Sequence, residues 1–196
     1  MLHHAVFSGP KETIKFLIRS RQKLGINIEE RTDGGTTFLH FACENRDIEI
    51  VDFVHNALIE INSDIDFDAH NERHGTPFHY ACKNKSNDVA IHLLQRFPNK
   101  INVLHHNGWH ALHFACNYGN LELVKYIFGN PDFDIDFNIT DQLGATPLHL
   151  ASYNGHFEVV KFLLENSHAK GIDKGSKIED FENETFLNAT LFQSSK

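Results

Sequence analysis

A short motif recurs five times along the chain and limits the possible folds more than any other feature. Each copy has an apolar residue (leucine or phenylalanine), then histidine, then one variable residue and alanine; the copies begin at Leu2, Leu39, Phe78, Leu112 and Leu148. The steps between successive copies are 37, 39, 34 and 36 residues. Similarity at a nearly constant period indicates an array of stacked structural units, because one such unit cannot bury its apolar face alone.

The residues around the motif predict two helices in each unit. Thr76 and Thr146 stand directly before a proline, and a threonine hydroxyl at that place can accept a hydrogen bond from an early helical N–H. Proline fits the first helical turn, where its missing N–H is not needed. A second helix is predicted by apolar residues at helical spacing, such as Val159, Val160, Phe162, Leu163 and Leu164.

Glycines are expected to end the first helix of two units. Gly119 and Gly155 follow the motif at the position where the end of the helix favours a residue in the left-handed backbone conformation. In two other units Arg46 and Lys85 occupy this place. We expect the residues before them, Asn45 and Asn84, to adopt the left-handed conformation instead.

The segments Thr76-Pro77-Phe78-His79-Tyr80-Ala81 and Thr146-Pro147-Leu148-His149-Leu150-Ala151 resemble the ankyrin-repeat signature T-P-L-H-x-A. The resemblance covers about residues 2–170. It implies an all-α fold, an α-solenoid of helix-turn-helix units with β-hairpin-like fingers. The expected units are about 1–32, 33–70, 71–104, 105–140 and 141–170, and residues 171–196 would form a polar loop plus a partial sixth repeat. The resemblance also implies that the motif histidine is structural and ties neighbouring loops together by hydrogen bonds.

The resemblance further implies a protein-protein interaction module, an adaptor or scaffold that binds a partner protein on the concave face of the array. In the family, the partner contacts the turn before the Thr-Pro motif and the positions just after the motif alanine. Carried over to this chain, the expected partner-binding residues are Trp109, Tyr118, Tyr153, Arg73, Lys83, His106, Asn117, Asn154, Leu143 and Glu44. Trp109 ranks first, because binding hot spots are enriched in Trp, Tyr and Arg. The alternative is that Trp109 folds back on its own loop.

The sequence contains no arrangement typical of catalysis. It has no nucleophile elbow, phosphate-binding loop, zinc-protease helix motif or glycine-rich dinucleotide turn, so we expect neither an enzyme nor a cofactor. Cys43, Cys82 and Cys116 each follow the motif alanine. Equivalent atoms of stacked helices lie about 8–10 Å apart, beyond the disulfide limit of about 7 Å. We therefore expect buried, free cysteines, as in a reducing compartment.

Two further clusters leave alternatives open. His70, His74, His105, His106 and His110 fall in the turns of adjacent repeats. They could form a metal site or a pH-sensitive patch, but nothing in the sequence fixes ligands at the distance of about 2.0–2.1 Å that zinc requires. The segments 64–68 and 132–137 alternate acidic and apolar residues. They are either solvated edges with Ile65 and Ile135 packed inward, or acidic ledges for a basic ligand.

Charge and hydropathy limit the partners. The net charge of −8 disfavours nucleic acid, which is bound mainly through Lys and Arg, and allows a partner protein with a basic segment. No apolar run approaches the roughly 18 residues of a membrane span, so we expect a cytoplasmic protein that does not bind a membrane. We also expect it to be monomeric. The alternative is that the repeats are the targeting or regulatory arm of a larger multidomain enzyme, channel or secreted effector.

Overall fold

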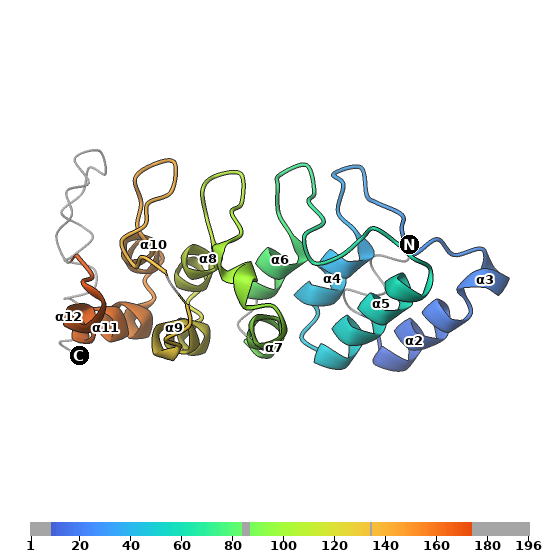
Figure 1. Cartoon of the computed structure of the whole chain (residues 1–196), viewed down its shortest axis with the longest axis horizontal. Helices are drawn as coiled ribbons and strands as arrows, with labels where there is room; N and C mark the ends of the chain where they lie inside the picture. Colours follow the sequence, from blue (N-terminus) through green and yellow to red (C-terminus); the bar gives the residue numbers. More distant parts are fainter. Residues whose placement is uncertain (1–8, 84–86, 134, 174–196) are drawn as a thin grey trace. The chain divides into compact units, whose positions relative to one another are not determined.

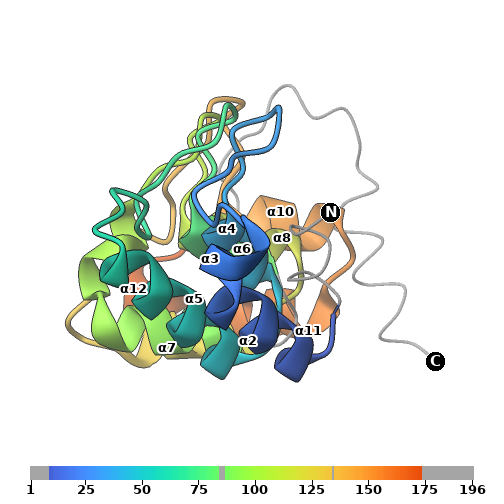
Figure 2. The ribbon, with the colours of Figure 1, turned by 90° about the vertical axis from the view of Figure 1, so that its right-hand side faces the viewer.

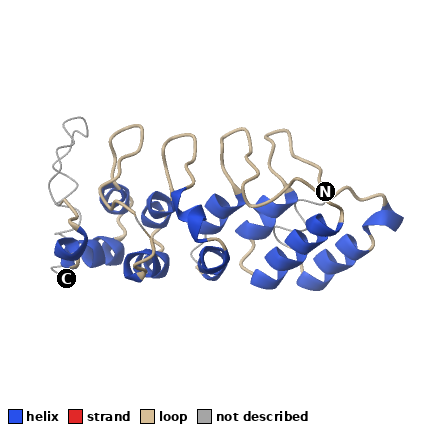
Figure 3. Cartoon of the chain, viewed as in Figure 1, coloured by secondary structure: helices blue, strands red, loops and turns tan. Residues whose placement is uncertain are grey.

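The computed structural model describes residues 9–83, 87–133 and 135–173, and within these ranges the regular structure consists of helices without a β-strand (Figures 1 and 3). The chain divides into two compact units, the N-terminal unit Met1–Lys100 and the C-terminal unit Ile101–Lys196. The first copy of the motif and the expected partial sixth repeat lie outside the described residues. The all-α expectation is confirmed.

The N-terminal unit is built from pairs of short helices. Its elements are α2 (Lys11–Arg19), α3 (Arg21–Leu24), α4 (Phe38–Glu44), α5 (Ile48–Glu60), α6 (Pro77–Lys83) and α7 (Asp88–Arg96), and the 3₁₀ helix η1 (Pro98–Asn102) spans the division between the units. The first helices α4 and α6 pack against each other, and each packs on its own second helix, α5 or α7. These are the helix pairs that the repeated motif predicts.

The C-terminal unit has the same organisation. It contains α8 (Ala111–Asn117), α9 (Leu121–Gly129), α10 (Pro147–Tyr153), α11 (Phe157–Glu165) and α12 (Ser167–Lys170). The first helices α8 and α10 pack together, and α9 and α11 pack beneath them. Within this unit the loops rise above α8 and α10, while α11 lies below (Figure 2). The loops therefore extend from the first helices and away from the second helices.

A capping residue and the motif histidine three positions later fix the start of the first helices; the capping residue is a threonine in α4 and α10 and His110 in α8. In α10 the Thr146 hydroxyl accepts from the backbone N–H of His149 at 3.4 Å, and the Thr146 N–H donates to His149 Nδ1 at 3.0 Å. This reciprocal arrangement is a capping box, in which histidine takes the place of the usual Glu or Gln. It satisfies two backbone donors that the first helical turn would otherwise leave unpaired.

The ends of the first helices match the expectation at the glycines but not at Asn45. Gly119 and Gly155 have φ angles of 72° and 70°, as predicted. Asn45 is extended, with φ −70° and ψ 140°, so the expectation of a left-handed Asn45 is wrong. Asn84, for which the same was expected, lies outside the described residues. The Asn45 side chain instead accepts a hydrogen bond from the N–H of Asp47 at 3.2 Å. Asp47 in turn caps α5 by accepting from the N–H of Glu49, so the turn is organised by side-chain acceptors.

The motif residues form the core of each unit. Leu39, Phe78 and Leu112 are fully buried, as are the motif alanines beside them. The three cysteines are also buried and free, as expected, and burial raises the pKa of each thiol. They therefore pack as small apolar side chains.

The acidic segments pack through alternate residues. In segment 64–68 the side chains of Ile65 and Phe67 are buried, and the three aspartates are exposed. In segment 132–137 Phe133 and Phe137 are buried, but Ile135 is only half-buried. The inward packing is thus confirmed for Ile65, whereas in the second segment the phenylalanines take that role.

Candidate functional site

Four short turns stand before the first helices, and we call them fingers. They comprise residues 32–36, 71–75, 105–109 and 141–145. In each finger the N–H of the first residue donates to the carbonyl of the last, for example from Asn71 to Gly75 at 3.0 Å and from Asp141 to Ala145 at 3.0 Å. The fingers are thus closed like hairpins, although these bonds do not extend into strands.

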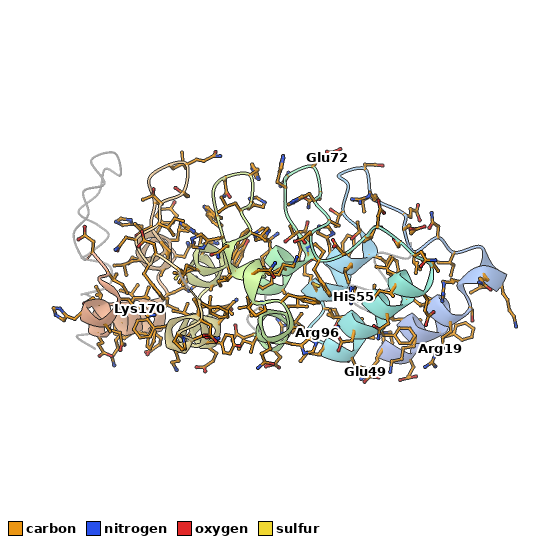
Figure 4. The ribbon with its side chains drawn as sticks, in the orientation of Figure 1. Arg19, Glu49, His55, Glu72, Arg96 and Lys170 are labelled. Atoms are coloured by element: carbon orange, nitrogen blue, oxygen red, sulfur yellow. The ribbon has the colours of Figure 1, made fainter. Side chains whose placement is uncertain are left out.

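Adjacent fingers within each unit are joined by backbone hydrogen bonds. The N–H of Glu72 donates to the carbonyl of Gly34 at 3.0 Å, and the N–H of Gln142 donates to the carbonyl of Asn107 at 3.0 Å. The Gln142 amide also donates to the carbonyl of His106 at 2.6 Å. Figure 4 shows the Glu72 side chain at the outer end of its finger. The bonds hold neighbouring fingers side by side while side chains remain at their tips.

In each unit a motif histidine anchors the second finger to the first helix of the preceding repeat. His40 Nδ1 accepts from the Thr37 N–H at 3.2 Å, so the ring proton is on Nε2, which lies 2.9 Å from the Gly75 carbonyl and donates to it. His113 makes the same bond to Ala145 at 3.3 Å. Burial lowers the pKa of His40 to about 4 and also lowers that of His113. The rings are therefore neutral, and their expected role in tying loops together is confirmed.

Asp141 organises the last described finger. Its Oδ1 accepts from the backbone N–H groups of Leu143 and Ala145, both at 2.9 Å, and its Oδ2 accepts from the indole Nε1 of Trp109 at 2.8 Å. In the N-terminal unit, Asn71 corresponds to Asp141, because its Oδ1 accepts from two backbone N–H groups of its own finger. One carboxylate thus fixes the shape of its finger and its link to the finger before it.

Trp109 is half-buried between a helix and the next finger. Its ring meets the edge of Phe114 at a centroid distance of 5.2 Å and stacks over His113 at 6.3 Å. Its indole N–H is bound by Asp141, which lies one finger further along the chain. Trp109 therefore does not fold back on its own loop alone, and it also contributes to holding two fingers together.

Large apolar side chains are exposed around these fingers. Leu143 at a finger tip is 79% exposed, Tyr153 at the end of α10 is 70% exposed, and Tyr118 after α8 is 36% exposed. The helix ends are joined by the amide of Asn154, which donates to Asn117 Oδ1 at 3.0 Å. We define the C-terminal finger surface as His106, Trp109, Asn117, Tyr118, Leu143, Tyr153 and Asn154. It holds all of the expected partner-binding residues of the C-terminal unit.

The other expected residues lie in the N-terminal unit and are charged. The Lys83 ammonium lies 4.1 Å from the centroid of the Tyr80 ring. Burial lowers the pKa of Lys83, Arg73 adds to that effect, and the carboxylate of Glu44 opposes it. Burial raises the pKa of Glu44. These charges are thus close enough to influence one another, and Tyr80 belongs to the cluster although sequence reasoning did not select it.

Within each unit, two histidines of the finger turns lie close together, and His110 lies against the motif histidine His113 with ring centroids 4.6 Å apart. His105 Nε2 and His106 Nδ1 are 3.3 Å apart, and the rings of His70 and His74 have a centroid distance of 6.1 Å. Among residues 9–83, 87–133 and 135–173, no group of three His, Cys, Asp or Glu side chains could hold a metal ion. None of the helices in these ranges is long and apolar enough to cross a membrane.

Comparison with known proteins agrees with the ankyrin-repeat resemblance seen in the sequence. A family model described as ankyrin repeats in three copies matches residues 2–103 and 78–178. The chain is 27% identical over 125 residues to the tyrosine-protein kinase Shark of Drosophila melanogaster, a match that covers 64% of this chain and 12% of that protein. It is 42% identical over 84 residues to the SMC5-SMC6 complex localization factor protein 1 of Bos taurus, which covers 42% of this chain and 8% of that protein. It is 30% identical over 135 residues to the tyrosine-protein kinase HTK16 of Hydra vulgaris, covering 64% of this chain and 16% of that protein.

The matched segments occupy less than a fifth of the length of each of these three relatives. The family model, by contrast, spans most of the present chain, and the helix pairs, capping boxes and finger anchors agree with it. The chain therefore belongs to the ankyrin-repeat family.

Proposed function

We infer that this chain is a protein-interaction module, which is the general role of ankyrin repeats. We propose that this chain is an adaptor or scaffold that binds a partner protein through its fingers and the ends of its first helices. The observation that carries this proposal is the exposure of Leu143 and Tyr153 on fixed elements. Because Asp141 and His113 already hold the finger of Leu143 in place, little conformational entropy is lost on binding.

The proposed contact residues differ in their roles. Leu143, Tyr153 and Tyr118 offer apolar area, and His106, Asn117 and Asn154 offer polar groups beside them. Trp109 contributes the part of its ring that is not buried, and it also supports the finger. In the N-terminal unit, Glu44, Arg73 and Lys83 are the proposed contacts for polar and charged groups of the partner.

Quantitative affinity capture from lysate tests this proposal. The wild type is compared with a Tyr118→Ala/Leu143→Ala/Tyr153→Ala variant, and circular dichroism verifies that both are folded. A Phe16→Ala/Ile59→Ala variant is the matched control, because these side chains are 62% and 58% exposed but lie on α2 and α5.

We expect proteins that the wild type and the control retain to be lost by the triple variant. Truncating a hot spot typically costs about 2 kcal/mol, or roughly a thirtyfold loss of affinity. Equal retention by the triple variant would show that the partner binds elsewhere. Loss with the control variant alone would assign binding to the second-helix side.

A second candidate function is that the array serves as the targeting or regulatory arm of a larger enzyme, channel or effector. It is supported by the relatives, since the two kinases contain the matched region as 12% and 16% of their length. Sequencing the full-length transcript tests this idea. A reading frame that adds a catalytic or membrane domain would support it, and a frame that adds none would refute it.

The remaining parts of the proposal concern the partner's charge and the protein's state. A basic segment of the partner would meet the exposed Asp64 and Asp66, since Asp68 is already paired with Lys100. We propose a monomeric, cytoplasmic, non-catalytic protein that does not bind nucleic acid. Sedimentation equilibrium and imaging of the tagged protein in its own cells test the first two points. Turnover and electrophoretic mobility-shift assays test the others.

A further inference from the structure

The described segments that carry the C-terminal finger surface are almost without formal charge. Fingers 105–109 and 141–145 and the helix ends 117–118 and 152–154 contain no Asp, Glu, Lys or Arg except Asp141. Asp141 is buried, and its carboxylate oxygens accept three N–H groups. Across the whole chain 22% of residues are charged, so these segments carry far less charge than the average composition would give them.

Equivalent positions in the N-terminal unit carry charges. Glu44 and Lys83 end α4 and α6 at the places that Asn117 and Tyr153 occupy in α8 and α10. The finger of residues 71–75 carries Glu72 and Arg73. The neutral surface is therefore a property of the C-terminal unit and does not follow from the repeat motif itself.

The neutral surface combines apolar area with amide groups. Leu143, Tyr153 and Tyr118 supply the apolar side chains. The amides of Asn117, Asn154 and Gln142 are partly engaged, because Asn154 donates to Asn117 and Leu150 and Gln142 donates to His106. The N–H groups of Asn117 and the amide oxygens of this set can still bond to the peptide backbone of a partner. Such a surface gains free energy by covering apolar area, at roughly 25 cal/mol per Å².

We propose that the C-terminal finger surface binds an uncharged, apolar segment of another protein. This inference rests on the proposed function and specifies the chemistry of its partner. A Lys, Arg, Asp or Glu of the partner would lose its hydration against this surface without meeting an opposite charge, which disfavours charged segments. A second copy of the chain is disfavoured by the net charge of −8 that each copy carries.

Selection from a displayed library of random peptides of about 16 residues tests the inference without a known partner. The full chain is immobilised, and the affinities of the enriched peptides are measured by fluorescence polarisation. We expect peptides with no net charge and several large apolar side chains. Their affinity should change less than about twofold between about 0.1 M and about 1 M NaCl, over which the Debye length falls from about 10 Å to about 3 Å.

A Leu143→Ser/Tyr153→Ser variant should weaken binding of these peptides at least about tenfold. Because both side chains are exposed, the variant should fold, which circular dichroism verifies. A Phe16→Ser/Ile59→Ser variant is the control and should bind as the wild type does, since it removes similarly exposed apolar side chains elsewhere.

The outcomes separate this inference from the proposed function. Suppose that the selection instead enriches charged peptides whose binding is strongly weakened by salt and is lost in the Leu143/Tyr153 variant. That result would support the binding surface but overturn its preference for a neutral partner. Peptides that this variant binds as well as the wild type does would overturn both statements. Absence of enriched peptides, or self-association of the wild type that the variant abolishes, would also overturn the inference.

Discussion

The buried His40 should make the stability of the N-terminal unit depend on pH. Its ring is inaccessible to solvent, its Nδ1 accepts from the Thr37 N–H, and its Nε2 donates to the Gly75 carbonyl. Burial is the largest cause that lowers its pKa to about 4, from 6.5 for a free histidine, and the hydrogen bond to Gly75 opposes this effect. The native structure therefore favours the neutral ring.

The sign and size of the effect follow from this pKa difference. Because the folded pKa is depressed, the unfolded chain binds the proton more readily. The stability contributed by the neutral ring is fully present above the unfolded pKa near 6.5, and it is lost as the pH falls toward about 4. At about 1.4 kcal/mol per pH unit, the complete loss is about 3 kcal/mol, and about 2 kcal/mol of it falls between pH 7 and pH 5.

Urea denaturation of the wild type and a His40→Gln variant at pH 7 and pH 5 measures this contribution. We expect the variant to be less stable by about 1–3 kcal/mol at pH 7, since it loses buried hydrogen bonds. Between pH 7 and pH 5, however, its free energy of unfolding should fall by about 2 kcal/mol less than that of the wild type. Proton NMR of the His40 ring follows the same group directly. A ring that titrates near pH 6.5, or equal losses of stability in the two proteins, would refute the reasoning.

Three further predictions concern the turns and the buried groups. In urea denaturation, Gly119→Ala should lower the free energy of unfolding by about 1–3 kcal/mol more than Gly155→Ala does. A Cβ at Gly119 would lie 2.6 Å from the His156 ring, whereas Gly155 has open space at a similar φ. Equal losses in the two variants would contradict the steric argument. Asp141→Ala should lower the free energy of unfolding by about 2–4 kcal/mol. Asp141→Asn should lower it less, since asparagine keeps an acceptor for the two backbone N–H groups. Equal losses of the two variants in urea denaturation would refute the role of Asp141 as an acceptor in its finger. Cys116 should react with maleimide only after unfolding, because burial raises its thiol pKa; mass spectrometry that finds rapid labelling of the native protein would contradict this.

Features that depend on a few neighbouring residues could be predicted from the sequence. The capping of α10 involves Thr146 and His149, which lie within one helical turn, so the motif alone determines the contact. The left-handed Gly119 and Gly155 were predictable for the same reason. The prediction for Asn45 failed because its side chain accepts a hydrogen bond from the nearby Asp47 N–H while its backbone stays extended. Both conformations are compatible with an asparagine beside a turn.

Contacts between repeats were less predictable. The sequence placed Trp109 in a finger and selected it as a contact residue. That its indole would meet Asp141, which is 32 residues away, depends on how neighbouring fingers stack. The pairing of Lys100 with Asp68 depends on packing in the same way. The exposure of Leu143 and Tyr153 agrees with the positions that the family comparison selected, whereas the neutrality of the surface around them becomes evident only when the residues are grouped in space.

The anchoring of the fingers by the motif histidines bears on how the chain can change in length. His40 reaches the carbonyl of Gly75 across 35 residues, and His113 reaches that of Ala145 across 32 residues, yet both make the same bond. The chain between helix and finger can thus gain or lose residues while the finger returns to the same place. Longer loops grafted after a second helix, for example after α5, should leave the fingers in register, so that an evolving or engineered protein can vary its second-helix side independently of its binding side.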